Sequence, residues 1–214
     1  DFEAPTCAII KHLNPCGTAT AADGERAFRA ALAADPVSAF GGIVAVNVSL
    51  TKAIAQAMSE EAGFLEAIIA PSVDQDALAV LKAAKWGKNV RIMDLGGHPP
   101  GGEQTQLRQV SGGFLLQTYV PGFLQDEKTV VTKTQPNDLQ LGCMDFAMRV
   151  CKHVKSNAIL LAVALEDGTF ATVGVGAGQM SRVDSVKIAV EKAGDKASGA
   201  VLASDAFFPF ADGL

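Results

Sequence analysis

Short apolar runs alternate with helix-like segments along most of this chain, and this alternation limits the folds open to it. The strand-like runs are residues 7–10, 43–48, 65–70 and 90–94, each rich in apolar residues. The intervening helix-like segments are residues 18–34, 51–61 and 74–85. Short strands separated by helices predict a layered α/β fold with a parallel or mixed sheet flanked by helices.

A Gly/Pro-rich break at residues 96–103 separates this first unit from a second one. We expect the break to be a surface loop, followed by a hairpin or meander over residues 106–109 and 113–120. The second unit has a helix over 139–154, paired strands over 159–165 and 169–175, a helix over 185–193 and a strand over 200–203. The predicted organisation is a first sub-domain at 1–96, a connection at 97–136 and a second sub-domain at 137–214.

Composition excludes several classes of partner and site. The 214 residues carry a formal net charge of -5 with no cluster of Lys or Arg, which argues against nucleic acid. No apolar run approaches the roughly 20 residues of a membrane helix. Four cysteines without a CxxC pair and three scattered histidines predict reduced thiols in the cytoplasm and no metal site. The first residue is not Met and the last residues read as the start of a helix, so we expect both ends to be truncated.

The pair Lys11-His12 follows the first strand and precedes Asn14-Pro15, which is predicted to form a tight turn. Strand ends that open into turns are where α/β proteins hold ligands. A cation next to a side chain that titrates near neutral pH is suited to anchoring a substrate and moving a proton. The alternative is a surface Lys beside a half-buried His that closes the strand.

Two further motifs carry polar side chains in the second unit. Asn157 lies where a helix gives way to a strand and could orient an amide or ring substituent, although a helix cap is the alternative. The Gly-rich residues 174–182 precede a helix, and Ser181 and Arg182 supply a hydroxyl and a bidentate fork for phosphate. A dinucleotide fingerprint fits the spacing poorly, so mononucleotide phosphate binding is favoured over a plain turn.

An aromatic cluster follows the last strand. Phe207, Phe208 and Phe210 surround Pro209, an arrangement that could form a wall against a planar heterocycle. Core packing is the alternative for each ring taken singly.

Five stretches of the chain together carry a resemblance to a known family. They are residues 10–17 (IKHLNPCG), 35–42 (DPVSAFGG), 155–157 (KSN), 176–182 (GAGQMSR) and 204–210 (SDAFFPF). In this order they resemble the transformylase domain of the bifunctional purine-biosynthesis enzymes, which pair aminoimidazole carboxamide ribonucleotide (AICAR) formyltransferase with IMP cyclohydrolase. The resemblance implies two cytidine-deaminase-like sub-domains and a homodimer with active sites at the subunit interface.

The resemblance also implies a reaction, the transfer of a formyl group from the co-substrate 10-formyltetrahydrofolate to the 5-amino group of AICAR. That amine is a poor nucleophile, so a base must remove a proton as the new bond forms. By resemblance, His12 transfers the proton, Lys11 stabilises developing negative charge and Asn157 orients the amine or His12.

The resemblance assigns the remaining site residues to the substrates. Ser181 and Arg182 are expected at the nucleotide phosphate and Phe207 against a ring. Other residues expected near the ligands are Pro209, Phe210, Asp212, Phe40, Gly41 and Asp94. No catalytic zinc is expected, because the H-x-E and P-C-x-x-C pattern of zinc deaminases is absent. The alternatives are a catalytically incomplete nucleotide-binding fragment and a metal-dependent deaminase on a related fold.

Overall fold

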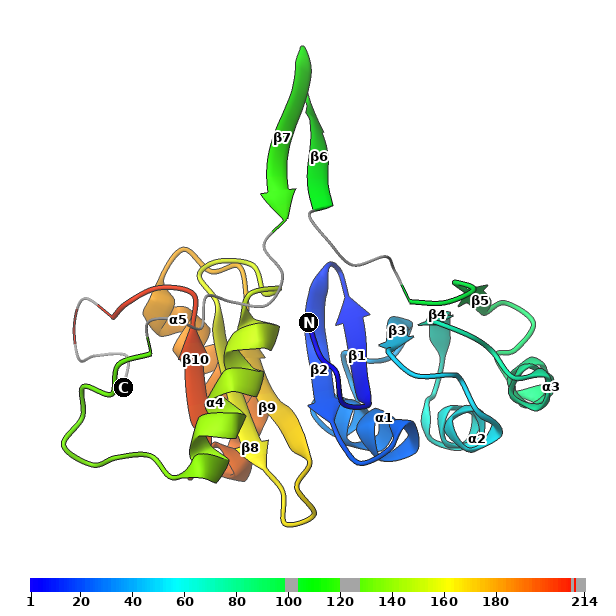
Figure 1. The fold of residues 1–214 in the computed structure, drawn as a ribbon, viewed down its shortest axis with the longest axis horizontal. Coiled ribbons are helices and arrows are strands. Elements are labelled where there is room, and N and C mark those ends of the chain that lie inside the picture. Colours follow the sequence, from blue (N-terminus) through cyan, green and yellow to red (C-terminus); the bar gives the residue numbers. More distant parts are fainter. Residues whose placement is uncertain (99–103, 120–127, 209, 211–214) are drawn as a thin grey trace.

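The computed structural model describes residues 1–98, 104–119, 128–208 and 210. Within these residues, eight strands form one mixed sheet in the order β10-β8-β9-β2-β1-β3-β4-β5, and two more form a separate hairpin (Figure 1). Helices lie against this sheet, so the layered α/β fold expected from the sequence is confirmed. None of the helices in the described ranges is long and apolar enough to cross a membrane.

The first half of the chain builds five neighbouring strands of the sheet. Its strands are β1 (Thr6–Lys11), β2 (Asn14–Thr20), β3 (Gly42–Val46), β4 (Leu65–Ala70) and β5 (Arg91–Asp94), and its helices are α1 (Gly24–Leu32), α2 (Lys52–Glu61) and α3 (Gln75–Ala83). β1 is antiparallel to both β2 and β3, while β3, β4 and β5 run parallel. Buried side chains such as Ile9, Phe28, Met58 and Leu65 form one core between these strands and helices.

The second half adds three strands at the other side of the sheet. Its elements are α4 (Asp138–Cys151), β8 (Ile159–Ala164), β9 (Phe170–Gly176), α5 (Arg182–Ala193) and β10 (Val201–Ser204). Alternate residues of β8 belong to different cores: Leu160 packs with α4, whereas Leu161 packs with α5. Because side chains alternate across a strand, α4 and α5 cover opposite faces of this half.

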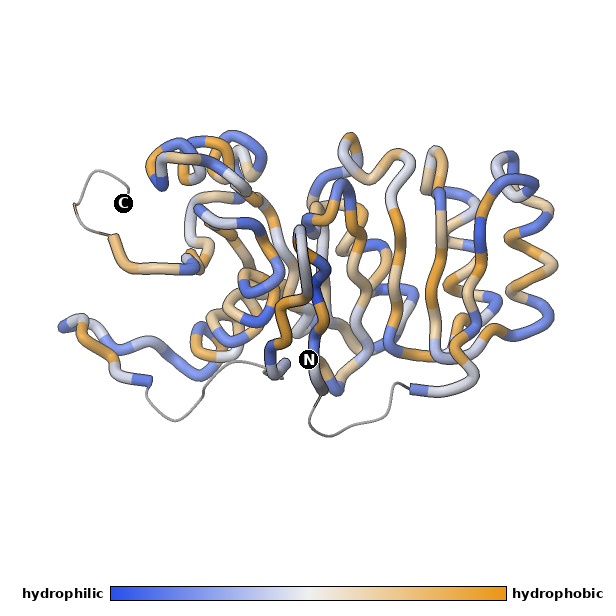
Figure 2. Tube along the Cα trace, turned by 90° about the horizontal axis from the view of Figure 1, so that it is seen from above, coloured by the Kyte–Doolittle hydropathy of each residue, from blue (hydrophilic) through white to orange (hydrophobic). Residues whose placement is uncertain are grey.

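The halves meet where β2 pairs with β9. Only Ala19 with Ala171 and Thr20 with Phe170 are paired in this ladder. Thr172 extends the contact by one step, since its hydroxyl accepts from the Thr18 amide at 2.9 Å. Figure 2 shows the two halves side by side along the sheet. The junction between β2 and β9, called the seam below, is therefore closed at one end by the strand ladder.

Two local predictions around β2 are wrong. The tight turn is formed by His12 and Leu13, and Asn14 already begins the returning strand. The first helix begins at Gly24, capped by the Asp23 carboxylate, and not at Thr18. Pro15 is accommodated in a strand because it pairs with Ile10 at an irregularity of the β1–β2 register, a place where proline is tolerated.

The predicted hairpin is confirmed as β6 (Gln104–Val110) and β7 (Gly113–Tyr119), and it projects from the sheet (Figure 1). Leu107 and Leu116 face one another across it and remain 64% and 71% exposed.

Candidate functional site

The turn between β1 and β2 presents His12 to solvent. His12 and Leu13 both have positive φ angles, 49° and 67°, in the left-handed region of backbone space. A two-residue hairpin turn needs this conformation at both positions and usually takes Asn or Gly there. Side chains such as His and Leu hold it at a cost of about 1–3 kcal/mol each, and such residues cluster at functional sites. Pairing of Lys11 with Asn14 on the flanking strands holds the turn closed.

Lys11 lies beside the turn and is held by the loop that precedes β3. Its Nζ donates to the carbonyl oxygens of Phe40 at 2.5 Å and Gly41 at 3.3 Å. Gly41 has a φ of 68°, and a Cβ there would lie 3.1 Å from the Lys11 Nζ, so this position favours glycine. The Phe40 ring is 61% exposed and packs at 5.7 Å from the Phe64 ring. The structure therefore brings together three predicted site residues: Lys11, Phe40 and Gly41.

A pocket of about 260 Å³ lies in the open end of the seam. Both halves of the chain contribute to its walls. From the first half they are Lys11, His12, Asn14, Pro15, Cys16, Asp35 and Ser38, and from the second half Val175, Ala177, Gln179, Ile188 and Lys192. Two cations, a carboxylate, an imidazole and two amides thus surround a small volume between β2 and β9, as binding of a polar molecule requires.

An ion pair crosses the seam at this pocket. Lys192 on α5 pairs with the Asp35 carboxylate and donates to the Ser38 hydroxyl at 3.3 Å. Burial by itself raises the pKa of Asp35, but Lys192 and the hydrogen bonds from Ser38 outweigh it and lower that pKa below its usual value. Burial, followed by the charge of Asp35, raises the pKa of the nearby Cys16 thiol to about 11, so this cysteine is protonated at neutral pH.

The Asn157 side chain is engaged on both of its polar atoms. Its Nδ2 donates to the carbonyl oxygens of Gln179 at 2.9 Å and Met180 at 3.0 Å. Its Oδ1 accepts from Arg182 Nη2 at 2.8 Å. Both N–H donors of the amide are therefore used within the protein, and only a lone pair of Oδ1 remains for a ligand.

Arg182 is the centre of this network. Its Nη1 donates to Ser204 Oγ at 2.7 Å and to Asp205 Oδ1 at 2.6 Å, and its side chain is only 14% exposed. Burial alone raises the pKa of Asp205, but the Arg182 guanidinium and a hydrogen bond from Ser156 lower it overall. The fork predicted to hold a phosphate is thus filled by protein groups, and Asp205, which belongs to the 204–210 motif but was not predicted as a site residue, is its ionic partner. A carboxylate directly after the last strand was the signal that could have indicated it.

The Gly-rich segment before α5 serves helix packing at two of its positions. A Cβ on Gly174 would lie 2.0 Å from the Ala189 carbonyl oxygen, and one on Gly176 would lie 1.9 Å from that of Ser185. The backbone of β9 therefore approaches α5 closely, and both positions require glycine for this packing. Ser181, which caps α5 without a side-chain hydrogen bond, is exposed and remains able to meet a ligand.

The aromatic residues after β10 divide into exposed and packed members. Phe207 is 80% and Phe210 72% exposed, so both rings are accessible to a ligand. Phe208 instead packs against the core beneath α5. Pro209 and Asp212, also predicted near the ligands, lie outside the described residues.

Asp94 is not brought to the seam. It ends β5, the outermost strand of the first half, and the register of β3, β4 and β5 places it at the opposite end of the sheet from Lys11. Its carboxylate accepts from the backbone amides of Val73 at 3.2 Å and Gly96 at 2.9 Å, a loop-stabilising arrangement.

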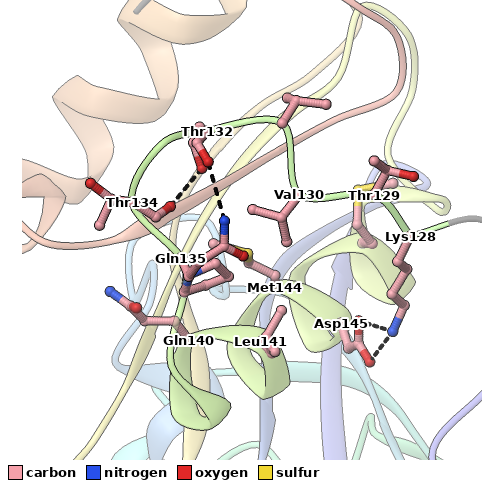
Figure 3. A pocket seen from close by; sticks show the side chains of 13 residues that line it. Lys128, Thr129, Val130, Thr132, Thr134, Gln135, Gln140, Leu141, Met144 and Asp145 are labelled. Atoms are coloured by element: carbon pink, nitrogen blue, oxygen red, sulfur yellow. Dashed lines mark hydrogen bonds and ion pairs between the residues drawn. The ribbon is translucent and has the colours of Figure 1, made fainter.

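A larger hollow of about 510 Å³ lies elsewhere, between residues 128–136 and α4 (Figure 3). Its walls include Val130, Leu141 and Met144, and the ion pair of Lys128 with Asp145 lies at one side. None of the predicted site residues lines it, and it offers neither an imidazole nor a thiol. The seam pocket is smaller but carries the chemistry, so we take the seam as the candidate site.

Among the residues that the structure describes, no three His, Cys, Asp or Glu side chains gather closely enough to hold an ion. The four cysteines are free thiols, three of them buried.

The fold and the seam define an α/β protein with a polar pocket between two halves of one mixed sheet, and comparison with known proteins identifies the family. A sequence model of the AICARFT/IMPCHase bienzyme family matches residues 1–192. The chain is 50% identical over its full length to a bifunctional purine biosynthesis protein PurH from Desulfitobacterium hafniense, of which it covers 40%. It is 50% identical over 97% of its length to a protein of that name from Brucella anthropi, covering 39%, and 44% identical over its full length to one from Sorangium cellulosum, covering 40%.

The chain therefore belongs to the AICARFT/IMPCHase bienzyme family. It spans about 40% of the length of these curated relatives.

Proposed function

We propose that this chain takes part in purine biosynthesis by formyl transfer from 10-formyltetrahydrofolate to the 5-amino group of AICAR. The observation that carries the proposal is the seam pocket, where an exposed imidazole on a strained turn lies beside a lysine and opposite polar groups of the second half. Acid–base work by an imidazole is the step that a weakly nucleophilic amine requires. Membership of a bienzyme family named for both activities supports formyl transfer without deciding between the two.

In the proposed reaction the co-substrate supplies the formyl carbon that forms a bond to the amine nitrogen of AICAR. His12 accepts the proton that the amine loses as this bond forms, and the departing folate nitrogen gains a proton when its bond to the formyl carbon breaks. Lys11 stabilises negative charge on the formyl oxygen. The remaining lone pair of Asn157 Oδ1 accepts a hydrogen bond from the amine and orients it.

The size of the pocket bears on how the two substrates are held. About 260 Å³ is below the roughly 300–1,000 Å³ of sites for drug-sized ligands, so the seam holds part of one substrate. We propose that Phe40, Phe207 and Ser181, all exposed, contact the rest of the ligands. A homodimer in which a second copy completes the site fits this exposure. The proposal places the protein in the cytoplasm, with small-molecule substrates and without nucleic acid or membrane partners.

Replacement of His12 tests the proposal. In the product of the complete reading frame that encodes these residues, His12→Ala should lower turnover by about 10²–10⁴-fold, the usual contribution of a general acid–base group. Nucleotide affinity should change far less. The measurement is steady-state release of tetrahydrofolate, with His98→Ala, an exposed histidine beyond β5, as the matched control. Turnover of His12→Ala within threefold of the control would remove His12 from the chemistry.

A further inference from the structure

Asn14 joins the turn that carries His12 to the opposite wall of the seam. We propose that Asn14 is a positioning residue, whose carboxamide fixes His12 relative to residues 155–157. This role rests on the proposed function, because it acts through His12. The side-chain hydrogen bonds of Asn14 go to backbone groups and not to the imidazole.

The carboxamide of Asn14 makes one hydrogen bond to each side. Its Oδ1 accepts from the backbone amide of Lys155 at 2.9 Å, across 141 positions of sequence. Its Nδ2 donates to the carbonyl oxygen of His12 at 3.3 Å. A single side chain thus ties the strained turn to the segment that carries Asn157.

The hydrogen bond between Asn14 and Lys155 is important because it lies at the open, pocket end of the seam. The strand ladder of β2 and β9 and the Thr18–Thr172 hydrogen bonds close the far end. At the pocket end, Asn14 supplies a hydrogen bond between the walls close to His12. Without it, we expect the separation of the turn and residues 155–157 to be set by more distant contacts.

The segment on the other side of the link is itself firmly held. The Lys155 carbonyl oxygen accepts from the Gly178 amide at 2.7 Å, and the Asn157 amide donates to the Gln179 carbonyl oxygen at 3.1 Å. Lys155 is therefore a fixed point against which Asn14 can hold the turn.

His12 needs such an external restraint. Among the residues that the structure describes, no hydrogen bond or ion pair to the His12 ring is found, and the residue is exposed. The direction of its side chain thus depends on the backbone of the turn, whose φ angles of 49° and 67° are unusual for His and Leu. When the His12 carbonyl oxygen and the following strand are held in place, the position of the His12 backbone, and with it the start of the side chain, is also fixed.

Two substitutions at one position separate the two hydrogen bonds. Asn14→Asp keeps an oxygen that accepts from the Lys155 amide and loses the donor to His12, whereas Asn14→Ala loses both. We expect Asn14→Ala to lower kcat by about 10- to 100-fold, since a misplacement of about 1 Å can cost that much. Nucleotide KM should stay within about threefold, and Asn14→Asp should recover a large part of kcat. Asn89→Ala, an exposed asparagine far from the seam, should match the wild type.

Amide hydrogen exchange measures the link without any assay of catalysis. Exchange at the Lys155 amide should accelerate at least about tenfold in Asn14→Ala and little in Asn14→Asp, because loss of a hydrogen bond allows local opening. Backbone resonances of His12 should shift in Asn14→Ala while those of α3 stay in place.

The outcomes are distinct. Wild-type kcat in Asn14→Ala would overturn the positioning role. Unchanged exchange at Lys155 would show that the link does not form. A wild-type protein with no formyl transfer would overturn the proposed function alone, while the Lys155 exchange rates and His12 resonances would still decide whether Asn14 fixes the turn.

Discussion

The polar side chains on the two sides of the seam differ in how far they are hydrogen-bonded within the protein. On the β1–β2 side, His12 stands exposed on a turn with two left-handed residues, and its ring meets no hydrogen-bonding group of the described residues. In the second half, behind the residues that line the pocket, Asn157, Arg182 and Asp205 bind one another and the backbone around them.

This difference indicates that one side of the site carries out proton transfer and the other maintains the local structure. A group that exchanges protons must reach the substrate, and an unpaired imidazole on a preset turn can do so. A network whose donors are already used holds the shape of its surroundings and contributes little new hydrogen bonding. We therefore expect substitutions on the first wall to change turnover, and substitutions on the second to change stability first.

Removal of Arg182 should give the largest change in stability. In Arg182→Met, hydrogen bonds to Asn157, Ser204 and the Asp205 carboxylate are lost. We expect the free energy of unfolding to fall by about 3 kcal/mol, because a partly buried carboxylate loses its ionic partner. Urea denaturation followed by circular dichroism measures it.

The matched control is Arg26→Met. Arg26 pairs with Asp23 at 3.4 Å and with Asp167 at 3.9 Å. All three side chains are about half exposed or more, so the loss of Arg26 should cost less than about 1 kcal/mol. If Arg182→Met behaves like this control and weakens binding of AICAR but not of its nucleoside, Arg182 is a phosphate ligand, as its sequence context predicts, and the contrast between the walls fails.

Removal of backbone strain from the β1–β2 turn should raise the free energy of unfolding. Leu13 is 77% exposed, so Leu13→Gly loses little packing and removes the strain of a φ of 67°. We expect the free energy of unfolding to rise by roughly 0.5–1 kcal/mol, since strain relief exceeds the added entropy of the unfolded chain. In Val37→Gly, at an 85% exposed position, only the entropic loss should appear. A loss of stability in both variants would mean that the turn stores no strain.

The sequence predicts regular elements well wherever local pattern and tertiary packing agree. β4 has the predicted bounds, and α2 begins after Thr51 as expected. The strand β2 was missed, because Pro15 and Gly17 indicate a turn by local rules while the pairing of β2 with β1 decides the structure. Only the three-dimensional register shows that His12 and Leu13 make the turn.

The sequence was sufficient to predict which residue types form the candidate site. It was not sufficient to predict which of these residues contact one another. The Lys11-His12 pair was found, since a charged dipeptide after an apolar run is visible in one dimension. The links of Asn14 to Lys155 and of Asp35 to Lys192 join residues 141 and 157 positions apart, and no local pattern encodes them. Arg182 shows the same limit, because its partners rather than its type decide whether its fork is available.

The ion pair of Asp35 and Lys192 connects the two walls, so its pH dependence tests how strongly they are coupled. Asp35 has a lowered pKa in the folded protein, which means that its charged form is favoured by folding. The stabilisation is therefore present above the pKa of the unfolded state and is lost as pH falls through the lower, folded value. Asp35→Asn removes this component at all pH values.

We accordingly expect Asp35→Asn to lower the free energy of unfolding at pH 7 by about 1 kcal/mol or less, as is typical of a partly exposed pair. The difference from the wild type should shrink as pH falls below about 4, where aspartates become protonated. Lys192→Met should show the same trend, and the double variant should lose little more than Lys192→Met alone, because both substitutions remove the same ion pair. Urea denaturation between pH 3 and pH 7 measures the coupling. Additive losses at pH 7 would show that the two walls are not joined through this pair.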